Sequence, residues 1–431
     1  MSKSMSKQHL LRIKNISQLV QVSNTFQKYK IGDDMKNVNI SENMTIIVNK
    51  EGKIEDIGNS DEMEKKYLEH TFEQEIDAKG KSVIPGFIDC HTHPVWSGDR
   101  CHEFAMKLNG ATYMEIHKQG GGIGFTVNHT RESSEEELLE LLIPRLNQMM
   151  RSGTTLVEAK SGYGLNCETE MKMLKVIEKA KKIHPIEIVS TFLAHSIPKD
   201  STIEKYTENV ISEQIPKLKE LMDKKELFPE LIDVFCEKGV FGIKESKAIL
   251  EEGKKLGLKI NFHGDELNPI KGAQLASELE AIGISHLEKI DKEGIKAIAK
   301  SKTSGVLLPT TGYILRLEQA PAREMISKNV IISLASDFNP NAPCTSIPFV
   351  MHLGCVQLRM TMEESLVATT LNAAYSLGKS ETHGSIEIGK FADFIILNNK
   401  LWQHIIYELT SDSIIDKVIK FGKVIFQNEK K

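Results

Sequence analysis

The sequence predicts an α/β protein, built as a (β/α)8 TIM-like barrel whose two chain ends have the texture of short β-strands. Between Ser82 and about Glu387 the chain of 431 residues repeats the order strand, polar loop, amphipathic helix, which is typical of parallel strands joined by helices. Eight strand candidates fall in this region, the number that closes such a barrel. They are Val83–Cys90, Thr154–Lys160, Ile186–Ala194, Leu231–Cys236, Leu258–His263, Ile284–His286, Ser304–Pro309 and Val330–Ser336.

Helices separate most of these strands. The clearest by apolar spacing are Ser134–Arg151, Glu168–Ile183, Ser246–Leu256 and Asp291–Lys300. In a β/α barrel the active residues lie just past the C-terminal ends of the strands. Those strand ends are therefore where functional side chains are expected.

Both ends of the chain have a β-rich pattern. Thr45–Val48 is apolar and β-branched, and the turn Lys50–Lys53 predicts a hairpin to Ile54–Ile57. Late in the chain, Gly389–Leu397 and Val418–Phe426 are strand-like in the same way. Strands therefore flank the predicted barrel on both sides.

Composition excludes several classes of function. A formal net charge of -4 and a pI near 6.4 give no basic surface for nucleic acid or for an acidic membrane. No apolar run approaches the roughly 20 residues needed to cross a bilayer, and the N-terminus lacks a signal-peptide core. The 6 cysteines are scattered, without a C-x-x-C pair, as expected for reduced thiols and a cytoplasmic location.

The first residues leave one alternative open. Residues 1–32 contain no Asp or Glu but several Lys and Arg, which faintly resembles an organelle transit peptide. However, Leu10–Ile16 has the pattern of a first strand. This favours the interpretation that the segment belongs to the fold.

The strongest local signal is a pair of histidines at the end of the first barrel strand. His91 and His93 lie two residues apart, and because side chains alternate along a strand, they point the same way. Two imidazoles on one face can share one divalent ion. Three later strands end in His263, His286 and Asp337, so four histidines and a carboxylate are expected at the barrel mouth.

This arrangement resembles the amidohydrolase superfamily and, within it, the imidazolonepropionase family. The matching stretches span nearly the whole barrel: Val83–Arg100, Gln119–Gly124, Ala159–Gly164, Thr191–His195, Asp233–Glu237, His263–Glu266 and Ser336–Pro340. The resemblance implies a small β-sandwich domain made from both chain ends. The expected domains are residues 1–84 and 387–431 for the sandwich and 85–386 for the catalytic barrel.

The resemblance also implies a metal centre and a reaction. By motif, His91, His93, His263 and Asp337 would hold one metal ion per subunit, Zn2+ or Fe3+. Binuclear relatives bridge two metals with a lysine at the end of the fourth strand, whereas here Lys238 is displaced from that place, which favours one metal. The implied activity is hydrolysis of the cyclic amide of 4-imidazolone-5-propanoate to N-formimidoyl-L-glutamate in histidine degradation, by a likewise implied homodimer.

Catalytic roles follow from the chemistry of such a centre. The ion lowers the pKa of its water toward about 7. His286 is expected to donate to the tetrahedral oxyanion. Glu266, three residues after His263, is expected to transfer protons to and from the water or the ring nitrogen, and Asp337 to share that role.

Substrate-binding residues are implied in the loops at the mouth. Arg100 can hold the propanoate carboxylate in a bidentate manner. The other implied contacts are Tyr163, His195, Glu266, Asn339 and Asn341. Where bacterial members have Gly followed by Ser or Thr, this chain has Asn341 and Ala342, so a hydroxyl contact is missing there.

Two other functions remain open at this stage. One is another amidohydrolase, such as a hydantoinase-like ring opener or an aminohydrolase acting on a nucleobase. The other is a non-enzymatic scaffold that has kept the fold and lost its chemistry. Retention of all the expected ligands argues against the scaffold, and Arg100 with the Ser-Gly-Tyr-Gly stretch argues for imidazolone propanoate over other rings.

Overall fold

A parallel sheet of eight strands forms the centre of the computed structural model, which describes residues 8–110, 121–409 and 413–429. Its strands follow one another in chain order: β8 (Phe87–Asp89), β9 (Thr154–Lys160), β10 (Glu187–Ala194), β11 (Leu231–Cys236), β12 (Lys259–Gly264), β13 (Gly283–His286), β14 (Ser304–Leu307) and β15 (Ile331–Leu334). A parallel bridge between Thr92 and Phe338 joins the ends of the first and last strands. The predicted β/α barrel is confirmed.

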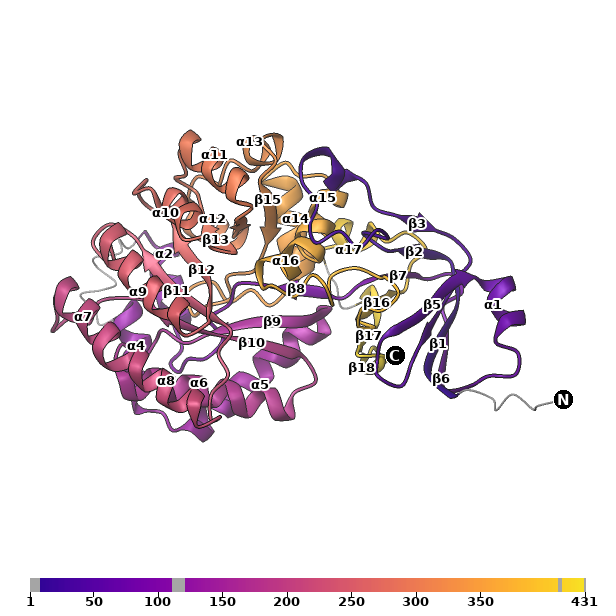
Figure 1. The fold of residues 1–431 in the computed structure, drawn as a ribbon, viewed down its shortest axis with the longest axis horizontal. Helices are drawn as coiled ribbons and strands as arrows, with labels where there is room; N and C mark the ends of the chain where they lie inside the picture. Colours follow the sequence, from indigo (N-terminus) through magenta and orange to yellow (C-terminus); the bar gives the residue numbers. More distant parts are fainter. Residues whose placement is uncertain (1–7, 111–120, 410–412, 430–431) are drawn as a thin grey trace.

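Helices cover the outside of these strands (Figure 1). They are α2 (Cys101–Leu108), α4 (Ile123–Glu132), α5 (Glu135–Arg151), α6 (Cys167–Ile183), α7 (Ile203–Asn209), the π-helix η2 (Val210–Gln214), α8 (Ile215–Asp223), α9 (Ile243–Lys255), α10 (Gly272–Glu278), α11 (Lys292–Ser301), α12 (Pro309–Leu315), α13 (Ala322–Ser327), α14 (Ile347–Val356), α15 (Met362–Ala368) and α16 (Leu371–Ser376). Helix α5 shows why they form. Ser134 and Glu137 make a reciprocal capping box, and Leu138, Leu142 and Leu146 are buried on one face.

A buried clasp closes the barrel between β8 and β15. The Asp89 carboxylate accepts hydrogen bonds from the backbone N–H and the hydroxyl of Ser336. The N–H of His93 donates to the carbonyl of Phe338 at 2.8 Å. Burial raises the pKa of Asp89 to about 7. The clasp fixes the strand that precedes His91 against the strand that precedes Asp337.

Two further sheets pack beside the barrel. One is formed by β5 (Ile54–Asn59), β4 (Met44–Val48), β1 (Gln8–Ile16) and β6 (Thr71–Asp77). The other is formed by β18 (Lys423–Gln427), β17 (Ile415–Lys420), β16 (Phe394–Leu397), β7 (Ser82–Pro85), β2 (Gln18–Val20) and β3 (Ile40–Ser41), so it combines both ends of the chain. The remaining short elements are η1 (Gly32–Lys36), α1 (Ser60–Lys66) and α17 (His404–Tyr407).

The faces of these two sheets share one apolar core. It contains Leu11 and Ile46 from the first sheet and Val83, Phe394 and Ile419 from the second. The expected sandwich of both chain ends is therefore present, and the predicted hairpin between β4 and β5 is confirmed.

Two predicted strands are divided in the structure. Val83–Cys90 was expected as one strand, but β7 and β8 belong to different sheets. The break falls at Gly86, where a Cβ would lie 2.4 Å from the side chain of Thr155. Val418–Phe426 is a hairpin, because Phe421 and Gly422 turn the chain with positive φ angles of 50° and 74°.

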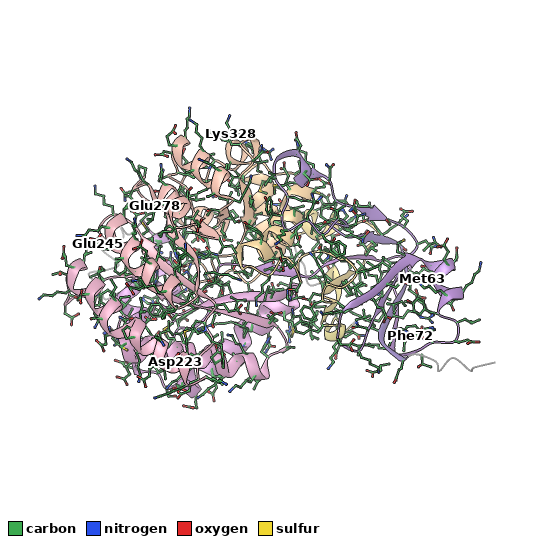
Figure 2. All side chains as sticks on the ribbon, in the orientation of Figure 1. Met63, Phe72, Asp223, Glu245, Glu278 and Lys328 are labelled. Atoms are coloured by element: carbon green, nitrogen blue, oxygen red, sulfur yellow. The ribbon has the colours of Figure 1, made fainter. Side chains whose placement is uncertain are left out.

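The outer helices present charge to the surroundings. Asp223 and Glu278 are the last residues of α8 and α10, Lys328 directly follows α13, and all three are exposed (Figure 2). Among the residues that the structure describes, no helix combines the length and the apolar character that a bilayer span requires.

Candidate metal centre and active site

The four predicted ligands converge at the C-terminal end of the barrel. The Nε2 atom of His263 lies 3.2 Å from that of His91 and 3.3 Å from that of His93. An oxygen of Asp337 lies 3.6 Å from Nε2 of His91 and 3.4 Å from Nε2 of His93. All four side chains are buried. Residues from three separate parts of the chain therefore point their donor atoms at one place.

These donors fit a single metal ion. Four ligand atoms at about 2.1 Å from a tetrahedral zinc are about 3.4 Å from one another. The distances from His263 to His91 and His93, and from Asp337 to His91 and His93, lie between 3.2 and 3.6 Å. His263 and Asp337 fall in two groups of possible ligands that share His91. Burial lowers the pKa of His263 to about 4 and that of His91 well below its usual value, so both imidazoles are neutral and offer lone pairs. Burial opposes ionisation of Asp337, but His93 and His286 outweigh it and lower its pKa.

Three of the proposed ligands each form a hydrogen bond with a second side chain. Nδ1 of His91 lies 2.8 Å from the hydroxyl of Ser285, and Nδ1 of His263 lies 2.9 Å from Oδ1 of Asp233. The hydroxyl of Thr311 donates to Asp337. Such partners fix the tautomer and orientation of a ligand before a metal arrives.

A buried ion triad lies behind His263. Nζ of Lys160 contacts Glu158 at 2.5 Å and Asp233 at 2.8 Å, and all three side chains are inaccessible to solvent. Burial favours the protonated form of Asp233, but His263 and Lys160 outweigh it and hold the pKa of this carboxyl well below its usual range. Asp233 is therefore ionised and can accept from the histidine.

A second group of acid and base lies beside the ligands. Nε2 of His286 is 3.5 Å from Glu266, and its Nδ1 is 3.6 Å from Glu288. Burial raises the pKa of Glu266 to about 7. Burial disfavours protonated His286, but Glu266 and Glu288 outweigh this effect and raise its pKa to about 10. The pair combines a proton donor with a carboxyl that titrates near neutral pH.

The backbone is strained at two of these positions. His286 has a φ of 79° and Asp337 a φ of 48°. Non-glycine residues seldom adopt these angles, and when they do they cluster at functional sites.

Two predicted substrate residues line the same centre. The ring of His195 stacks on that of His93, with centroids 5.3 Å apart, and Tyr163 packs edge-on against His195 at 5.3 Å. Nδ1 of His195 donates to the carbonyl of Gly162 at 3.2 Å. Burial lowers the pKa of His195 well below its usual value, so its Nε2 is an acceptor.

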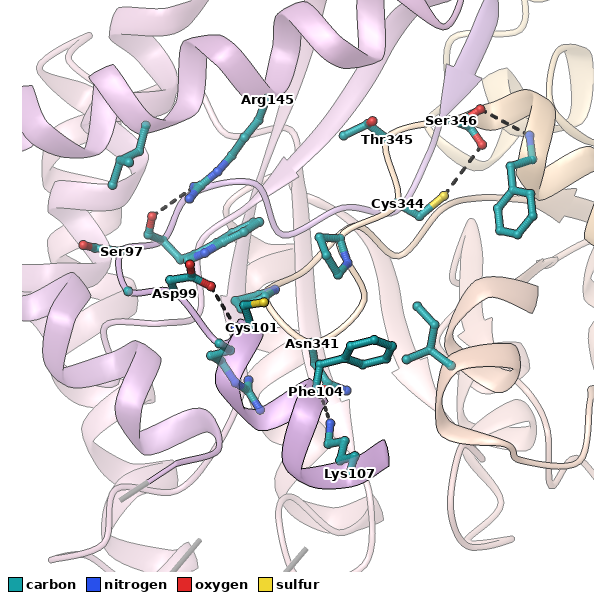
Figure 3. A pocket seen from close by; sticks show the side chains of 18 of the residues that line it. Ser97, Asp99, Cys101, Phe104, Lys107, Arg145, Asn341, Cys344, Thr345 and Ser346 are labelled. Atoms are coloured by element: carbon teal, nitrogen blue, oxygen red, sulfur yellow. Dashed lines mark hydrogen bonds between the residues drawn. The ribbon is translucent and has the colours of Figure 1, made fainter. Parts of the chain in front are cut away.

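A cavity of about 1050 Å³ has Arg100 and Asn341 in its wall, but none of the four metal ligands lines it. Both nitrogens Nε and Nη2 of Arg100 contact one oxygen of Glu103, at 3.0 and 2.8 Å. The other Glu103 oxygen accepts from the N–H of Gly122. Lys107 donates to the side-chain oxygen of Asn341 (Figure 3). Glu103 therefore fixes one edge of the Arg100 guanidinium, and among the described contacts Nη1 has no partner.

The side chain of Asn339 makes its hydrogen bonds within its own loop. Its oxygen accepts from the N–H groups of Asn341 and Ala342, and its Nδ2 donates to the carbonyl of Asp337 at 2.6 Å. Ala342 is fully buried. Of the stretch Gln119–Gly124, residues 119 and 120 lie outside the described part of the chain.

The sequence analysis did not identify the residues that support the ligands. Asp233, Lys160, Glu158 and Ser285 were all missed. The sequence did contain one signal. Asp233 is a lone acid in an apolar strand, and Glu158 and Lys160 lie two residues apart in another. Charged side chains in buried strands must find partners.

Comparison with known proteins agrees with this geometry. A model of the amidohydrolase family matches residues 82–425. The chain is 56% identical over 423 residues to "Probable imidazolonepropionase" of Nematostella vectensis, covering 96% of this chain and 99% of that one. It is 57% identical to the protein of the same name from Dictyostelium discoideum (97% and 98% covered) and 51% identical to that of Homo sapiens (98% and 100% covered).

Solved structures share the fold at much lower identity. An adenosine deaminase from Xanthomonas campestris with bound zinc has a TM-score of 0.69 at 14% identity, covering 98% of this chain and 94% of the other. Guanine deaminase of E. coli has a TM-score of 0.69 at 16% identity, covering 97% and 100%.

Proposed function

This chain belongs to the amidohydrolase family, and within it to the imidazolonepropionases, and from that premise we propose how its residues open a cyclic amide. The enzyme hydrolyses the ring amide of 4-imidazolone-5-propanoate to N-formimidoyl-L-glutamate. The observation that carries the proposed mechanism is the convergence of three imidazole nitrogens and one carboxylate oxygen, backed by Asp233.

We propose that His91, His93, His263 and Asp337 hold one ion, Zn2+ or Fe3+. The donor set of three nitrogens and one oxygen supports this, because imidazole and carboxylate suit both metals. When bound there, such an ion lowers the pKa of a coordinated water toward about 7 and polarises the ring carbonyl. One ion is favoured over two, because Lys238 is displaced from the end of the fourth barrel strand, where binuclear relatives have their bridging lysine.

Glu266 is proposed to move the proton. The attacking water forms a C–O bond to the ring carbonyl carbon and gives up a proton, and Glu266 accepts it because its pKa lies near 7. The ring C–N bond then breaks, and the same carboxyl returns the proton to the leaving nitrogen. Asp337 can share this role while acting as a ligand.

His286 is proposed to stabilise the tetrahedral oxyanion. Protonated between Glu266 and Glu288, it presents a charged N–H donor beside the ligands. A donor of this kind typically contributes a factor of about 10² to 10³ to kcat.

Arg100 is proposed to hold the propanoate carboxylate. Glu103 fixes its orientation, and Arg100 lines the same cavity as Asn341. Tyr163 and His195 would flank the ring beside His93. Asn339 would act mainly by shaping the loop after Asp337.

We also propose a cytoplasmic homodimer with the domains 1–84, 85–386 and 387–431. All six cysteines are free, which supports the cytoplasmic location because thiols stay reduced in that compartment. The pairing of β7 with β16, and not with β8, supports the first boundary.

The test couples metal analysis to turnover. The purified protein is assayed on 4-imidazolone-5-propanoate before chelation, after chelation and after addition of Zn2+ or Fe3+, with hydantoin and guanine as control substrates. We expect about one ion per chain, loss of activity on chelation and recovery on reloading. Turnover of a control ring in preference to the imidazolone would refute the substrate, and turnover that survives complete metal removal would refute the centre.

A further inference from the structure

The loop between His93 and Arg100 sets the distance between two ends of the substrate. His93 belongs to the group that would act on the ring, and Arg100 to the cavity that would receive the tail. Only residues 94–99 connect them. The contacts that hold residues 94–99 therefore influence the distance between the sites proposed for the ring and for the carboxylate of the substrate.

Arg145, on helix α5, contacts the backbone and the tryptophan of this loop. Its Nη1 donates to the carbonyl of Pro94 at 2.8 Å and to that of Trp96 at 2.9 Å, and its guanidinium carbon lies 3.5 Å from the centroid of the Trp96 ring. Figure 3 shows Arg145 reaching from its helix to the loop that carries Ser97 and Asp99.

The charge of Arg145 is not used in an ion pair with any described carboxylate. Burial lowers its pKa to about 10, so placing a cation here is unfavourable unless the contacts compensate. Two backbone carbonyls and an indole face provide that compensation. Contacts of this kind are suited to holding backbone in place.

The loop is also fastened on its other side. The ring of Trp96 packs against Phe338 with centroids 5.0 Å apart, and Phe338 directly follows Asp337. The N–H of Ser97 donates to the hydroxyl of Thr130 at 3.1 Å. Trp96 is thus held between Arg145 and the end of β15, which ties the loop to the metal-binding end of the barrel.

We propose that Arg145 is a positioning residue that fixes Arg100 relative to the metal centre and so selects a ring whose carboxylate lies one propanoate chain away. This inference rests on the proposed function of Arg100. Arg145 lines the same cavity as Arg100, but in this proposal it does not bind the substrate. It acts through the backbone of residues 94–99.

The experiment compares Arg145→Ala and Arg145→Lys with the wild type on two substrates, 4-imidazolone-5-propanoate and the same ring without its propanoate chain. In Arg145→Ala we expect KM for the full substrate to rise about tenfold or more. The reason is that a displacement of a substrate-positioning group by about 1 Å can lower the catalytic rate by a factor of up to about 10². The expected KM for the tail-less ring is unchanged, as is metal content. Arg145→Lys keeps the charge but loses the planar stack, so an intermediate KM is expected.

Two further readouts separate positioning from general destabilisation. Guanidinium added at millimolar concentration should recover part of the lost KM in Arg145→Ala. In a Trp402→Phe background Trp96 is the sole tryptophan, and its emission should shift to longer wavelength once the arginine is removed. Arg151→Ala, at the exposed end of the same helix, is the matched control and should change none of these quantities.

Equal changes in KM for both substrates, or loss of metal from Arg145→Lys, would overturn the inference in favour of a merely structural role. Unchanged KM and emission in Arg145→Ala would overturn it as well. Failure of the proposed function is distinguishable, since the wild type would then not turn over 4-imidazolone-5-propanoate at all.

Discussion

Replacing Asp233 by Asn should weaken metal binding without removing a ligand. Asp233 accepts from Nδ1 of His263 with one oxygen, and its other oxygen forms an ion pair with Lys160 at 2.8 Å. An amide of the same shape can accept on only one side, so in either orientation its NH2 group faces a donor. The change therefore either loosens His263 or leaves the Lys160 ammonium with Glu158 alone.

The expected magnitude follows from the bond that is lost. A hydrogen bond to a charged group contributes about 1.5–3 kcal/mol, and about 1.4 kcal/mol corresponds to a factor of ten. If the whole loss appears in metal binding, Kd rises by about 10- to 150-fold. This range agrees with the 10- to 100-fold typical of partners that support metal-bound histidines.

The assay is competition for Zn2+ against a chromophoric chelator, with wild type, Asp233→Asn and Asp223→Asn measured side by side. Asp223 is exposed at the end of α8 and pairs only with Lys219 among the described contacts, so its variant controls for loss of one carboxylate. Circular dichroism establishes that each apoprotein is folded. A folded Asp233→Asn protein whose Kd matches the wild type within about threefold would refute the reasoning.

Three other outcomes are expected. Arg100→Ala should raise KM by about tenfold or more with metal content unchanged, because a charge-assisted bond to the carboxylate is lost; an unchanged KM would contradict the assignment. Glu266→Gln should lower kcat by about 10² to 10⁴, and wild-type kcat/KM should fall as pH drops through about 7, since protonation removes the base whose pKa burial has raised; an acid limb that persists unchanged in Glu266→Gln would contradict its role. Ser336→Ala should lower the free energy of unfolding by about 1–3 kcal/mol, because it leaves the buried Asp89 carboxylate short of a donor; equal denaturation midpoints for variant and wild type would show that the clasp is unimportant.

The convergence of the proposed ligands could be predicted from the sequence because barrel topology brings strand ends together. His91, His263 and Asp337 each follow a recognisable apolar strand, and the fold alone brings those ends together. The interpretation of His286 and Glu266 as part of the same group rested on the same rule.

The supporting contacts could not be predicted, because they depend on register between strands. Asp233 on β11 meets Lys160 on β9 across the intervening strand β10. The residue pattern of neither strand indicates this partner. Arg145 looks from the sequence like any arginine on an amphipathic helix. Its role becomes apparent only once α5 is packed against the loop after β8.

The division at Gly86 was missed for a related reason. Val83–Cys90 is apolar apart from Asp89, and buried strands of two adjacent sheets have the same composition. The contact that distinguishes them is the hydrogen bond from the N–H of Gly86 to the carbonyl of Asp393.

The placement of β7 between β2 and β16 has a consequence for synthesis. When the ribosome has made β7, one edge of this strand already has its partner, but the other edge must wait until nearly the whole barrel has emerged. During that interval an apolar strand is unpaired on one side, a state that invites association with other chains. Nascent chains of this enzyme should therefore need protection by chaperones until β16 has been translated.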